Sequence, residues 1–262
     1  MRITFIGAGR VATHLAKVLH QQHHIVQVFS RDLANAENLA SQVNAQAIDQ
    51  FAQLDSRTDL VVIAVSDQVI AEIMNSITSL VPQSLIVHTS GSTSLITIEQ
   101  ASQRTGVFYP LQTFSLDRDI DWIETPIFVE ASTQADLEIL TGLANSLSNR
   151  VYQYSSKQRQ TLHLAAVFAC NFSNYCYDMA QQIVAAEQVD FSLLYPLITE
   201  TASKAVVNQP KLMQTGPAMR GDQNILKMHQ QLLAQSERTD LERIYTLMSD
   251  GIFKRHHLDN KS

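Results

Sequence analysis

The sequence predicts an α/β protein, in which a doubly wound parallel sheet is followed by an all-helical domain. Three observations lead to this class: a glycine-rich turn after the first strand, alternating strand and helix patterns over residues 1–154, and helical patterns alone over residues 155–262. The chain has 262 residues, 45% of them hydrophobic, which is enough apolar surface for two domains of ordinary size.

The strands predicted for the first domain are short and apolar. They cover residues 2–6, 25–29, 60–65, 84–88, 106–109, 127–130 and 151–154, and further helices are predicted at 33–43, 67–80 and 134–147. The strand at 60–65 is continuously apolar rather than alternating, which is typical of a parallel strand covered by helices on both faces.

Strand patterns are absent from the second half of the sequence. Helical periodicity runs through residues 156–186, 190–207, 220–235 and 238–253. Pro196, Pro210 and the Gly216-Pro217 pair are expected to mark breaks between these helices, with the first turn of a helix as the alternative place for Pro196. Cys170 and Cys176 lie in an apolar helical stretch without metal-ligand spacing, so buried thiols are expected.

The first twelve residues, MRITFIGAGRVA, read as a strand that turns directly into a helix. In a dinucleotide-binding turn, the first glycine permits the bend and the second lets backbone N–H groups approach a pyrophosphate. A small third residue then lets the helix pack on the strand, and the helix N-terminus favours an anion. The predicted cofactor contacts are therefore Gly7, Gly9, Arg10, Val11 and Ala12, with Arg10 near the phosphate or the adenine. A purely structural turn is the alternative.

The end of the second strand predicts which dinucleotide binds. A carboxylate there accepts hydrogen bonds from ribose hydroxyls, whereas an arginine accommodates a 2′-phosphate. Ser30 and Arg31 occupy this place, so we expect NADP, with NAD as the alternative. Asp32 follows at once and serves either a ribose or the cap of the next helix.

Residues that follow the strand at 60–65 fall at the carboxyl edge of the sheet, where open α/β domains bind their ligands. We expect Val65 and Ser66 to contact the nicotinamide half of the cofactor. Asp67 either contacts the cofactor as well or caps the next helix.

Charge and composition exclude several classes of function. The net charge is −6 and the sequence has no run of lysine or arginine, so nucleic-acid binding is not expected. No apolar stretch approaches the roughly 20 residues that span a bilayer. The N-terminus lacks the pattern of a signal peptide, and no cluster has metal-ligand spacing, which together predict a cytoplasmic protein without a metal site.

Five motifs carry a resemblance that spans nearly the whole chain. They are GAGRVA at 7–12, HTSGS at 88–92, YPLQTF at 109–114, HLAAVFACNF at 163–172 and TGPAMRGD at 215–222. The chain resembles the bacterial "Rossmann-like and DUF2520" proteins and, more distantly, β-hydroxyacid dehydrogenases and pyrroline-5-carboxylate reductases. The resemblance implies a Rossmann-type first domain, a helical domain similar to that of 6-phosphogluconate dehydrogenase-like enzymes, and an NADP-linked oxidoreductase.

The distant dehydrogenase relatives hold a substrate carboxylate with a Ser-Gly turn, and Ser90-Gly91 stands at the matching place. A polar loop that only joins strand to helix is the alternative. Tyr109 stands where family members tend to have histidine, and we expect it to contact substrate. Arg220 is expected either at an anionic ligand between the domains, at a partner subunit, or in an architectural role.

The same relatives use a proton donor and an amide side chain on the first helix of the helical domain, where this chain has His163 and Asn171. Eight residues correspond to about 80° around an α-helix, so both side chains can face one cleft. Histidine readily exchanges a proton near neutral pH, which suits His163 as the donor, with Asn171 orienting the substrate. Satisfied interior polar groups are the alternative, and the lysine of the relatives is absent.

The leading hypothesis is an NADP-dependent oxidoreductase that acts on a small carbonyl, hydroxy-acid or imine substrate bound between the domains. Two alternatives remain: a non-catalytic NADP(H) sensor, and a reductase that uses a deazaflavin as hydride partner. The helical domain is expected to form a homodimer, because a thin helical layer would otherwise expose apolar faces.

Overall fold

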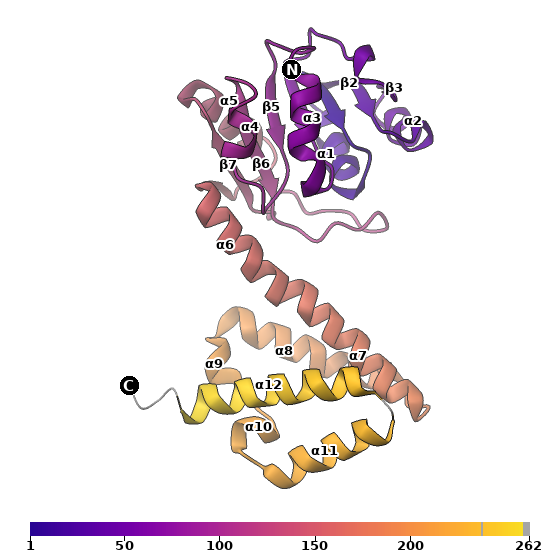
Figure 1. The fold of residues 1–262 in the computed structure, drawn as a ribbon, viewed down its shortest axis with the longest axis vertical. Helices are drawn as coiled ribbons and strands as arrows, with labels where there is room; N and C mark the ends of the chain where they lie inside the picture. Colours follow the sequence, from indigo (N-terminus) through magenta and orange to yellow (C-terminus); the bar gives the residue numbers. More distant parts are fainter. Residues whose placement is uncertain (237, 259–262) are drawn as a thin grey trace. The chain divides into compact units, whose positions relative to one another are not determined.

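The computed structural model describes residues 1–236 and 238–258 (Figure 1). Its first part is a twisted sheet whose strands follow the order β3-β2-β1-β4-β5-β6-β7-β8 in the described residues. The bounds are β1 Arg2–Ile6, β2 His24–Phe29, β3 Gln46–Ile48, β4 Leu60–Ile63, β5 Leu85–His88, β6 Thr105–Pro110, β7 Ile127–Ala131 and β8 Val151–Gln153. Only the β6–β7 pair is antiparallel among these strands. The predicted α/β class is confirmed.

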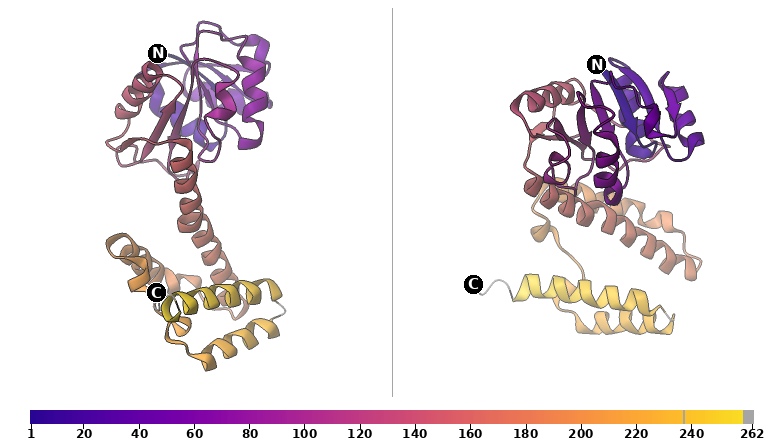
Figure 2. Two further views of the ribbon diagram at one scale, coloured as in Figure 1. Left: turned by 60° about the vertical axis from the view of Figure 1, so that its left-hand side comes forward. Right: turned by 45° about the horizontal axis from the view of Figure 1, so that its top comes forward.

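Helices cover both faces of the sheet (Figure 2). Helices α1 (Arg10–His20), α2 (Leu33–Gln42) and α5 (Gln134–Asn145) pack on one face, and α3 (Ile70–Ile77) and α4 (Ile96–Glu99) on the other. Successive strand residues point to opposite faces, so both sets of side chains must be apolar: in β4, Val62 joins one core and Ile63 the other. The continuous apolar run predicted for this strand has that cause.

The elements of the sheet unit differ from those predicted at several places, two of which bear on the cavity edge and the sheet order. The short edge strand β3 was not predicted, because its three residues, Gln46–Ile48, are too few to show a pattern and pair with β2 alone. The strand predicted over 60–65 ends at Ile63, and the next helix begins with a 3₁₀ turn at Asp67–Val69 before α3. Residues 64–66 are therefore a loop at the carboxyl edge of the sheet, and Asp67 begins the 3₁₀ turn.

The chain is helical after β8. The helices are α6 Ser156–Ala166, α7 Ser173–Ala186, α8 Tyr195–Val207, α9 Pro210–Met213, α10 Pro217–Arg220, α11 Gln223–Gln235 and α12 Thr239–His257. A π-helical segment, Val167–Phe172, joins α6 to α7. Pro196 lies in the first turn of α8, which was the alternative to a break at this residue, whereas Pro217 begins α10 after Gly216, which has φ +104°. Asp222 accepts a hydrogen bond from the Ile225 N–H and caps α11, which starts three residues later than predicted.

Internal contacts divide the chain into a sheet unit, residues 1–171, and a helical unit that begins at Phe172. Helix α6 thus belongs to the sheet unit, although strands end at Gln153. The predicted domain boundary at 154/155 follows the change in secondary structure and stays a prediction.

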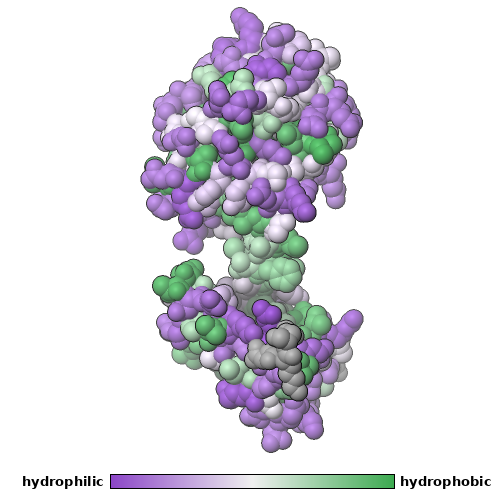
Figure 3. All heavy atoms as spheres, turned by 90° about the vertical axis from the view of Figure 1, so that its left-hand side faces the viewer, coloured by the Kyte–Doolittle hydropathy of each residue, from purple (hydrophilic) through white to green (hydrophobic). Residues whose placement is uncertain are grey.

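Apolar side chains of the helical unit are largely exposed on this single chain. Among its described residues, the buried apolar side chains are Met179, Ala218 and Leu241. Cys170 is exposed and Cys176 half-buried, so the prediction of buried thiols is wrong for the single chain. Figure 3 shows many apolar residues on the molecular surface. No described helix combines the length and the hydropathy that crossing a membrane requires.

Candidate cofactor and substrate site

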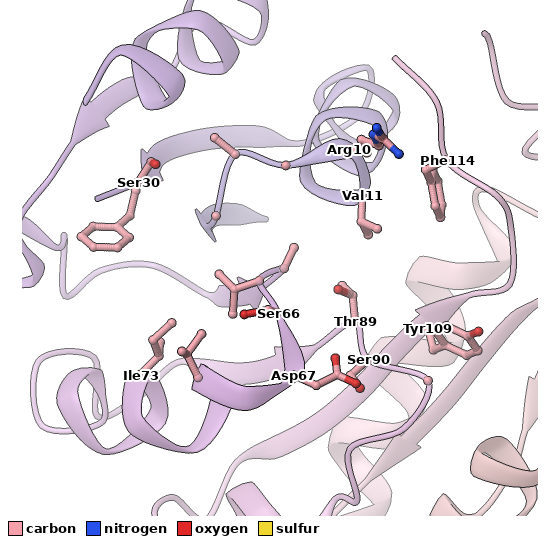
Figure 4. Close-up of a pocket in the computed structure, with 18 of the residues that line it drawn as sticks. Arg10, Val11, Ser30, Ser66, Asp67, Ile73, Thr89, Ser90, Tyr109 and Phe114 are labelled. Atoms are coloured by element: carbon pink, nitrogen blue, oxygen red, sulfur yellow. The ribbon is translucent and has the colours of Figure 1, made fainter. Parts of the chain in front are cut away.

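A cavity of about 680 Å³ opens at the carboxyl ends of β1, β4, β5 and β6, and residues of the sheet unit line it. Strands β1 and β4 are neighbours, but the helices that follow them pack on opposite faces, which makes this the switch point of the sheet. Figure 4 shows Ser30 and Tyr109 on opposite sides of the cavity, with Ser66 and Thr89 between them. We call the two sides the nucleotide end and the substrate end.

Gly7 makes the tight bend that starts the nucleotide end. Its φ is +113°, and a Cβ on it would stand 2.3 Å from the carbonyl oxygen of Ala64. Its N–H donates to the Phe29 carbonyl oxygen at 2.8 Å. Only glycine combines this backbone conformation with this approach between strands.

Gly9 serves a different purpose, because a Cβ there would meet no atom within 4 Å. It precedes α1, whose N-terminus has no side-chain cap and no acidic residue in its first turn. The first N–H groups of α1 are therefore available to an anion at the cavity wall. Ala12 is fully buried where α1 packs on the sheet, and Val11 lines the cavity. This cradle fits a pyrophosphate.

The loop after β2 distinguishes the two roles considered for Asp32. The Asp32 carboxylate accepts hydrogen bonds from the N–H of Ala34 at 3.1 Å and from the Asn35 side chain at 3.1 Å, so it caps α2. Ser30 and Arg31 line the cavity instead. Within the described residues, the guanidinium groups of Arg10 and Arg31 have neither a hydrogen bond nor an ion pair. A hydroxyl and two uncommitted guanidinium groups fit a phosphorylated ribose.

Val65, Ser66 and Asp67 also line the cavity, at the end of β4. Asp67 does not cap the helix that follows; its carboxylate accepts a hydrogen bond from the Ser92 hydroxyl. The loop after β4 is thereby joined to the loop after β5.

Tyr109 and His163 meet at the substrate end. The Tyr109 hydroxyl lies 3.0 Å from His163 Nδ1, and both side chains line the cavity. Burial raises the pKa of Tyr109 to about 12, so the phenol keeps its proton at neutral pH. A Cβ at Gly91 would stand 2.5 Å from His163 Nδ1 and 2.8 Å from Tyr109 Cζ. The glycine allows the two rings to approach the loop.

The Ser90 hydroxyl accepts hydrogen bonds from the N–H groups of Ser92 at 3.1 Å and Thr93 at 2.8 Å, which shapes the loop. The Ser90 N–H donates to Nδ1 of His88, which is fully buried. Burial lowers the pKa of His88 to about 3, so its ring is neutral at neutral pH. Its Nε2 is a buried atom without a hydrogen-bond partner in the described structure.

Sequence reasoning missed two residues of this region, His88 and Arg159. His88 is the last residue of a predicted strand, and Arg159 lies in a polar stretch of α6. Neither position has a neighbouring sequence pattern that indicates a functional residue. Arg159 is 1% exposed and reaches the loop at residues 90–93. Only the folded chain reveals that an arginine on a polar helix start is buried.

The structure does not bring every predicted residue to the cavity. Asn171 is exposed and does not line it. The 80° separation from His163 assumed an α-helix throughout, whereas residues 167–172 form π turns with a wider repeat. Arg220 belongs to the helical unit, at the end of α10.

Two family models match the chain. Residues 2–91 match the model described as NADP oxidoreductase, coenzyme F420-dependent, and residues 125–252 match the domain of unknown function DUF2520. A search of curated proteins found no match.

Solved structures resemble the whole chain. A candidate NADP oxidoreductase from Bacteroides fragilis is 40% identical, with a TM-score of 0.91 over 97% of this chain and 98% of that one. A protein from Thermotoga maritima is 20% identical, with a TM-score of 0.70 over 99% and 100% of the two chains. An imine reductase from Myxococcus stipitatus in complex with NADP+ is 17% identical, with a TM-score of 0.70 over 97% and 92%, and shares the fold.

The match to the Bacteroides fragilis protein extends over almost the full length of both chains. The first family model covers the sheet from β1 to β5, and the second begins before β7 and continues into α12. The chain belongs to the family of Rossmann-like proteins that carry the DUF2520 domain.

Proposed function

We propose that this protein is an NADP-dependent reductase that acts on a small substrate with a C=O or C=N bond. One observation carries the proposal: a single cavity joins a pyrophosphate cradle with two uncommitted arginines to the hydrogen-bonded pair of Tyr109 and His163. The description of the matched family model and the name of the Bacteroides fragilis relative support it.

NADPH, when bound, supplies a hydride that adds two electrons to the substrate carbon. The double bond between that carbon and its oxygen or nitrogen becomes a single bond. The protein must then supply a proton to this oxygen or nitrogen. His163 is the proton donor in this proposal: its Nδ1–H donates to the Tyr109 oxygen, which orients the imidazole. The Tyr109 hydroxyl holds the substrate atom and passes its proton to it, and the proton of Nδ1 replaces that proton on the phenol. Thr89, Ser90 and Gly91 line the same end and position the substrate. The proton is replaced from solvent.

The residues with cofactor roles in this proposal are Gly7, Gly9, Arg10, Val11, Ala12, Ser30, Arg31, Val65 and Ser66. The test is a titration of the purified protein with NADPH and with NADH, followed by nicotinamide fluorescence. Tighter binding of NADPH than of NADH supports the proposal. Arg31→Ala is expected to reduce NADPH affinity about 10- to 100-fold, because it removes a charge-assisted contact to the 2′-phosphate. NADH affinity should stay unchanged, because NADH lacks this phosphate. Arg57→Ala is the control, because Arg57 pairs with Asp55 and does not line the cavity. Binding of neither nucleotide contradicts the proposal.

Small 2-oxo acids and cyclic imines are then offered with NADPH, and 3-hydroxy acids with NADP+. The readout is NADPH consumption for the first two classes and NADPH formation for the third. Turnover that falls in His163→Ala supports the catalytic assignment. A sensor instead of an enzyme is indicated if the protein binds the nucleotide tightly and turns over no member of the panel. In that case His163→Ala and Asn171→Ala leave nucleotide binding unchanged.

A deazaflavin hydride partner is the second candidate, and the description of the matched model, which names coenzyme F420, favours it. Such a partner would exchange a hydride with the nicotinamide in place of a carbonyl or imine substrate. A deazaflavin absorbs visible light, so a spectroscopic titration of the NADP+-loaded protein distinguishes it from a carbonyl or imine substrate.

We also propose that the helical domain, from residue 155 onward, completes the substrate site through Asn171 and Arg220. These residues are exposed in the single chain and carry an amide and a guanidinium group suited to a polar or anionic substrate. Asn171→Ala and Arg220→Ala should raise KM for the substrate and leave the NADPH dissociation constant unchanged. An unchanged KM in both variants contradicts this part of the proposal.

A homodimer through the helical domain is the final element. Leu193 is 70% exposed and Val206 86% exposed, in a unit with three buried apolar side chains among its described residues. A second copy of the same surface would cover such faces. Sedimentation is expected to give twice the chain mass, and Val206→Asp to shift the protein toward monomer. A wild-type monomer at micromolar concentration contradicts this element alone.

A further inference from the structure

Arg159 is a buried cation that the proposed reaction does not use. It lies on α6, is 1% exposed, and does not line the cavity. Its Nη1 donates to three carbonyl oxygens of the loop after β5: Ser90 at 2.9 Å, Gly91 at 3.1 Å and Thr93 at 2.8 Å. A charged donor directed at three backbone carbonyls ties helix and loop together.

The second terminal nitrogen of the guanidinium, Nη2, is also held by two partners, whereas Nε has no hydrogen-bond partner in the described structure. Nη2 donates to Glu130 Oε2 at 3.2 Å and to the Ser156 hydroxyl at 3.0 Å. The Glu130 carboxylate also accepts from the N–H of Ser156 at 2.9 Å, at the start of α6. The charge of Arg159 is thus balanced, and the plane of its guanidinium is fixed by β7 and by its own helix.

The loop itself is bound from two directions. The remaining carbonyl of residues 90–93, that of Ser92, accepts from Gln160 of α6 at 2.7 Å. On its other side, the Ser92 hydroxyl donates to Asp67, the first residue of the 3₁₀ turn that follows β4. The loop therefore links the cofactor edge of the sheet to α6.

Arg159 and His163 are four residues apart on α6 and so lie on the same face of the helix. The space available to His163 is small, because a Cβ at Gly91 would stand 2.5 Å from its Nδ1. The distance of 3.0 Å between His163 Nδ1 and the Tyr109 hydroxyl consequently depends on how α6 is anchored against the loop. Arg159 is the buried group that makes this anchor.

We propose that Arg159 is a positioning residue, which sets the contact between Tyr109 and His163 by holding the loop carbonyls and Glu130 at the same time. The effect of Arg159 on catalysis rests on the proposed function. The contact between Tyr109 and His163 can be measured without any substrate. Lysine cannot replace it, since one ammonium group lacks the planar fork that serves both edges.

The test uses the full-length protein with ¹⁵N-labelled histidine and no ligand. The ring signals of His163 are assigned by their loss in His163→Gln. Tyr109→Phe removes the hydrogen bond and should shift the Nδ1 signal. The proposal predicts that Arg159→Lys shifts this signal in the same direction, with a native-like cooperative melt.

Arg104→Lys is the matched control. Arg104 also pairs with a buried carboxylate, Asp136, at 2.6 Å and donates to a backbone carbonyl, that of Gln83, but it does not touch the loop. It should lower the melting temperature without moving the His163 signal. The proposal is overturned if folded Arg159→Lys protein gives the same His163 signal as the wild type. It is also overturned if Tyr109→Phe leaves the His163 signal unchanged.

Glu130→Gln covers the case in which Arg159→Lys does not fold. It retains the shape of the side chain and removes the charge that pairs with Arg159, so a smaller shift of the His163 signal in the same direction is expected. An unchanged signal in this folded variant contradicts the proposal.

Activity supplies a separate readout once a substrate is found. Arg159→Lys should lower kcat on the order of 100-fold, as small misplacements of reacting groups do, while KM for NADPH stays within about twofold. If no substrate is reduced by the wild type, the proposed function fails, and the NMR result still decides the role of Arg159.

Discussion

Gly91 and His163 lie so close that a single added carbon at residue 91 would stand 2.5 Å from the imidazole Nδ1. The same carbon would stand 2.8 Å from Tyr109 Cζ. The substrate end of the cavity is therefore formed by two rings that the absence of one side chain permits to approach the loop.

Gly91→Ala should displace His163 from Tyr109. We expect kcat to fall on the order of 100-fold, at a stability cost of about 1–3 kcal/mol from overpacking, with NADPH affinity unchanged. Steady-state kinetics, nucleotide fluorescence and urea unfolding measure the three effects. Gly142→Ala is the control, because a Cβ there meets no atom within 4 Å in the middle of α5. Wild-type kcat in Gly91→Ala would show that the two rings need not touch.

Gly7→Ala and Gly9→Ala should separate folding from cofactor binding. A Cβ at Gly7 would stand 2.3 Å from Ala64 O at a φ of +113°, so we expect a loss of about 2–5 kcal/mol from strain and overpacking. A Cβ at Gly9 meets no protein atom within 4 Å but enters the pyrophosphate cradle. Gly9→Ala should have the melting temperature of the wild type and bind NADPH weakly. NADPH affinity equal to that of the wild type would contradict pyrophosphate binding at the N-terminus of α1.

His88 should make the protein sensitive to acid. Burial lowers its pKa from 6.5 to about 3. Between these two pH values the His88 ring is protonated in the unfolded chain and neutral in the folded chain. The contribution of neutral His88 is fully present above pH 6.5 and is lost as the pH falls toward 3, at up to about 1.4 kcal/mol per pH unit.

Urea unfolding at pH 7.0, 6.0 and 5.0 measures this loss. His88→Gln should flatten the pH dependence even where it lowers stability at pH 7.0, because the amide does not titrate. His229→Gln is the control, since His229 is only partly buried and bonds Tyr245 in the helical unit. An equal slope in wild type and His88→Gln would assign the acid sensitivity to other groups.

Tyr109→Phe should leave the nucleotide end intact and impair proton transfer. The variant removes the hydroxyl that lies 3.0 Å from His163 Nδ1 and keeps the ring, which packs near Phe128. We expect kcat to fall about 100-fold or more, in line with the loss of a positioned acid–base group, with the NADPH dissociation constant unchanged. Stopped-flow measurement of hydride transfer is the direct check, and an unchanged rate would remove Tyr109 from the reaction.

Local patterns were sufficient for the nucleotide end. The bend at Gly7, the small residue at Ala12 and the pair Ser30-Arg31 each act within a few residues of their own position, so spacing alone predicts their place. The sequence allows two roles for Asp32, because a carboxylate before a helix suits a ribose and a cap equally well. The side-chain hydrogen bond to the Ala34 N–H assigns it to the cap.

The sequence by itself determined the fold class, the strand-turn-helix at residues 2–12 and the position of the nucleotide end, because short-range periodicity and glycine spacing encode them. Only the tertiary structure decided that Tyr109 meets His163 across 54 residues and that Arg159 reaches Ser90 across 69. It also placed Asn171 outside the cavity, through a π segment that periodicity does not reveal. The physical reason is that a buried charge or a ring contact depends on which strands become neighbours, and no local pattern records that.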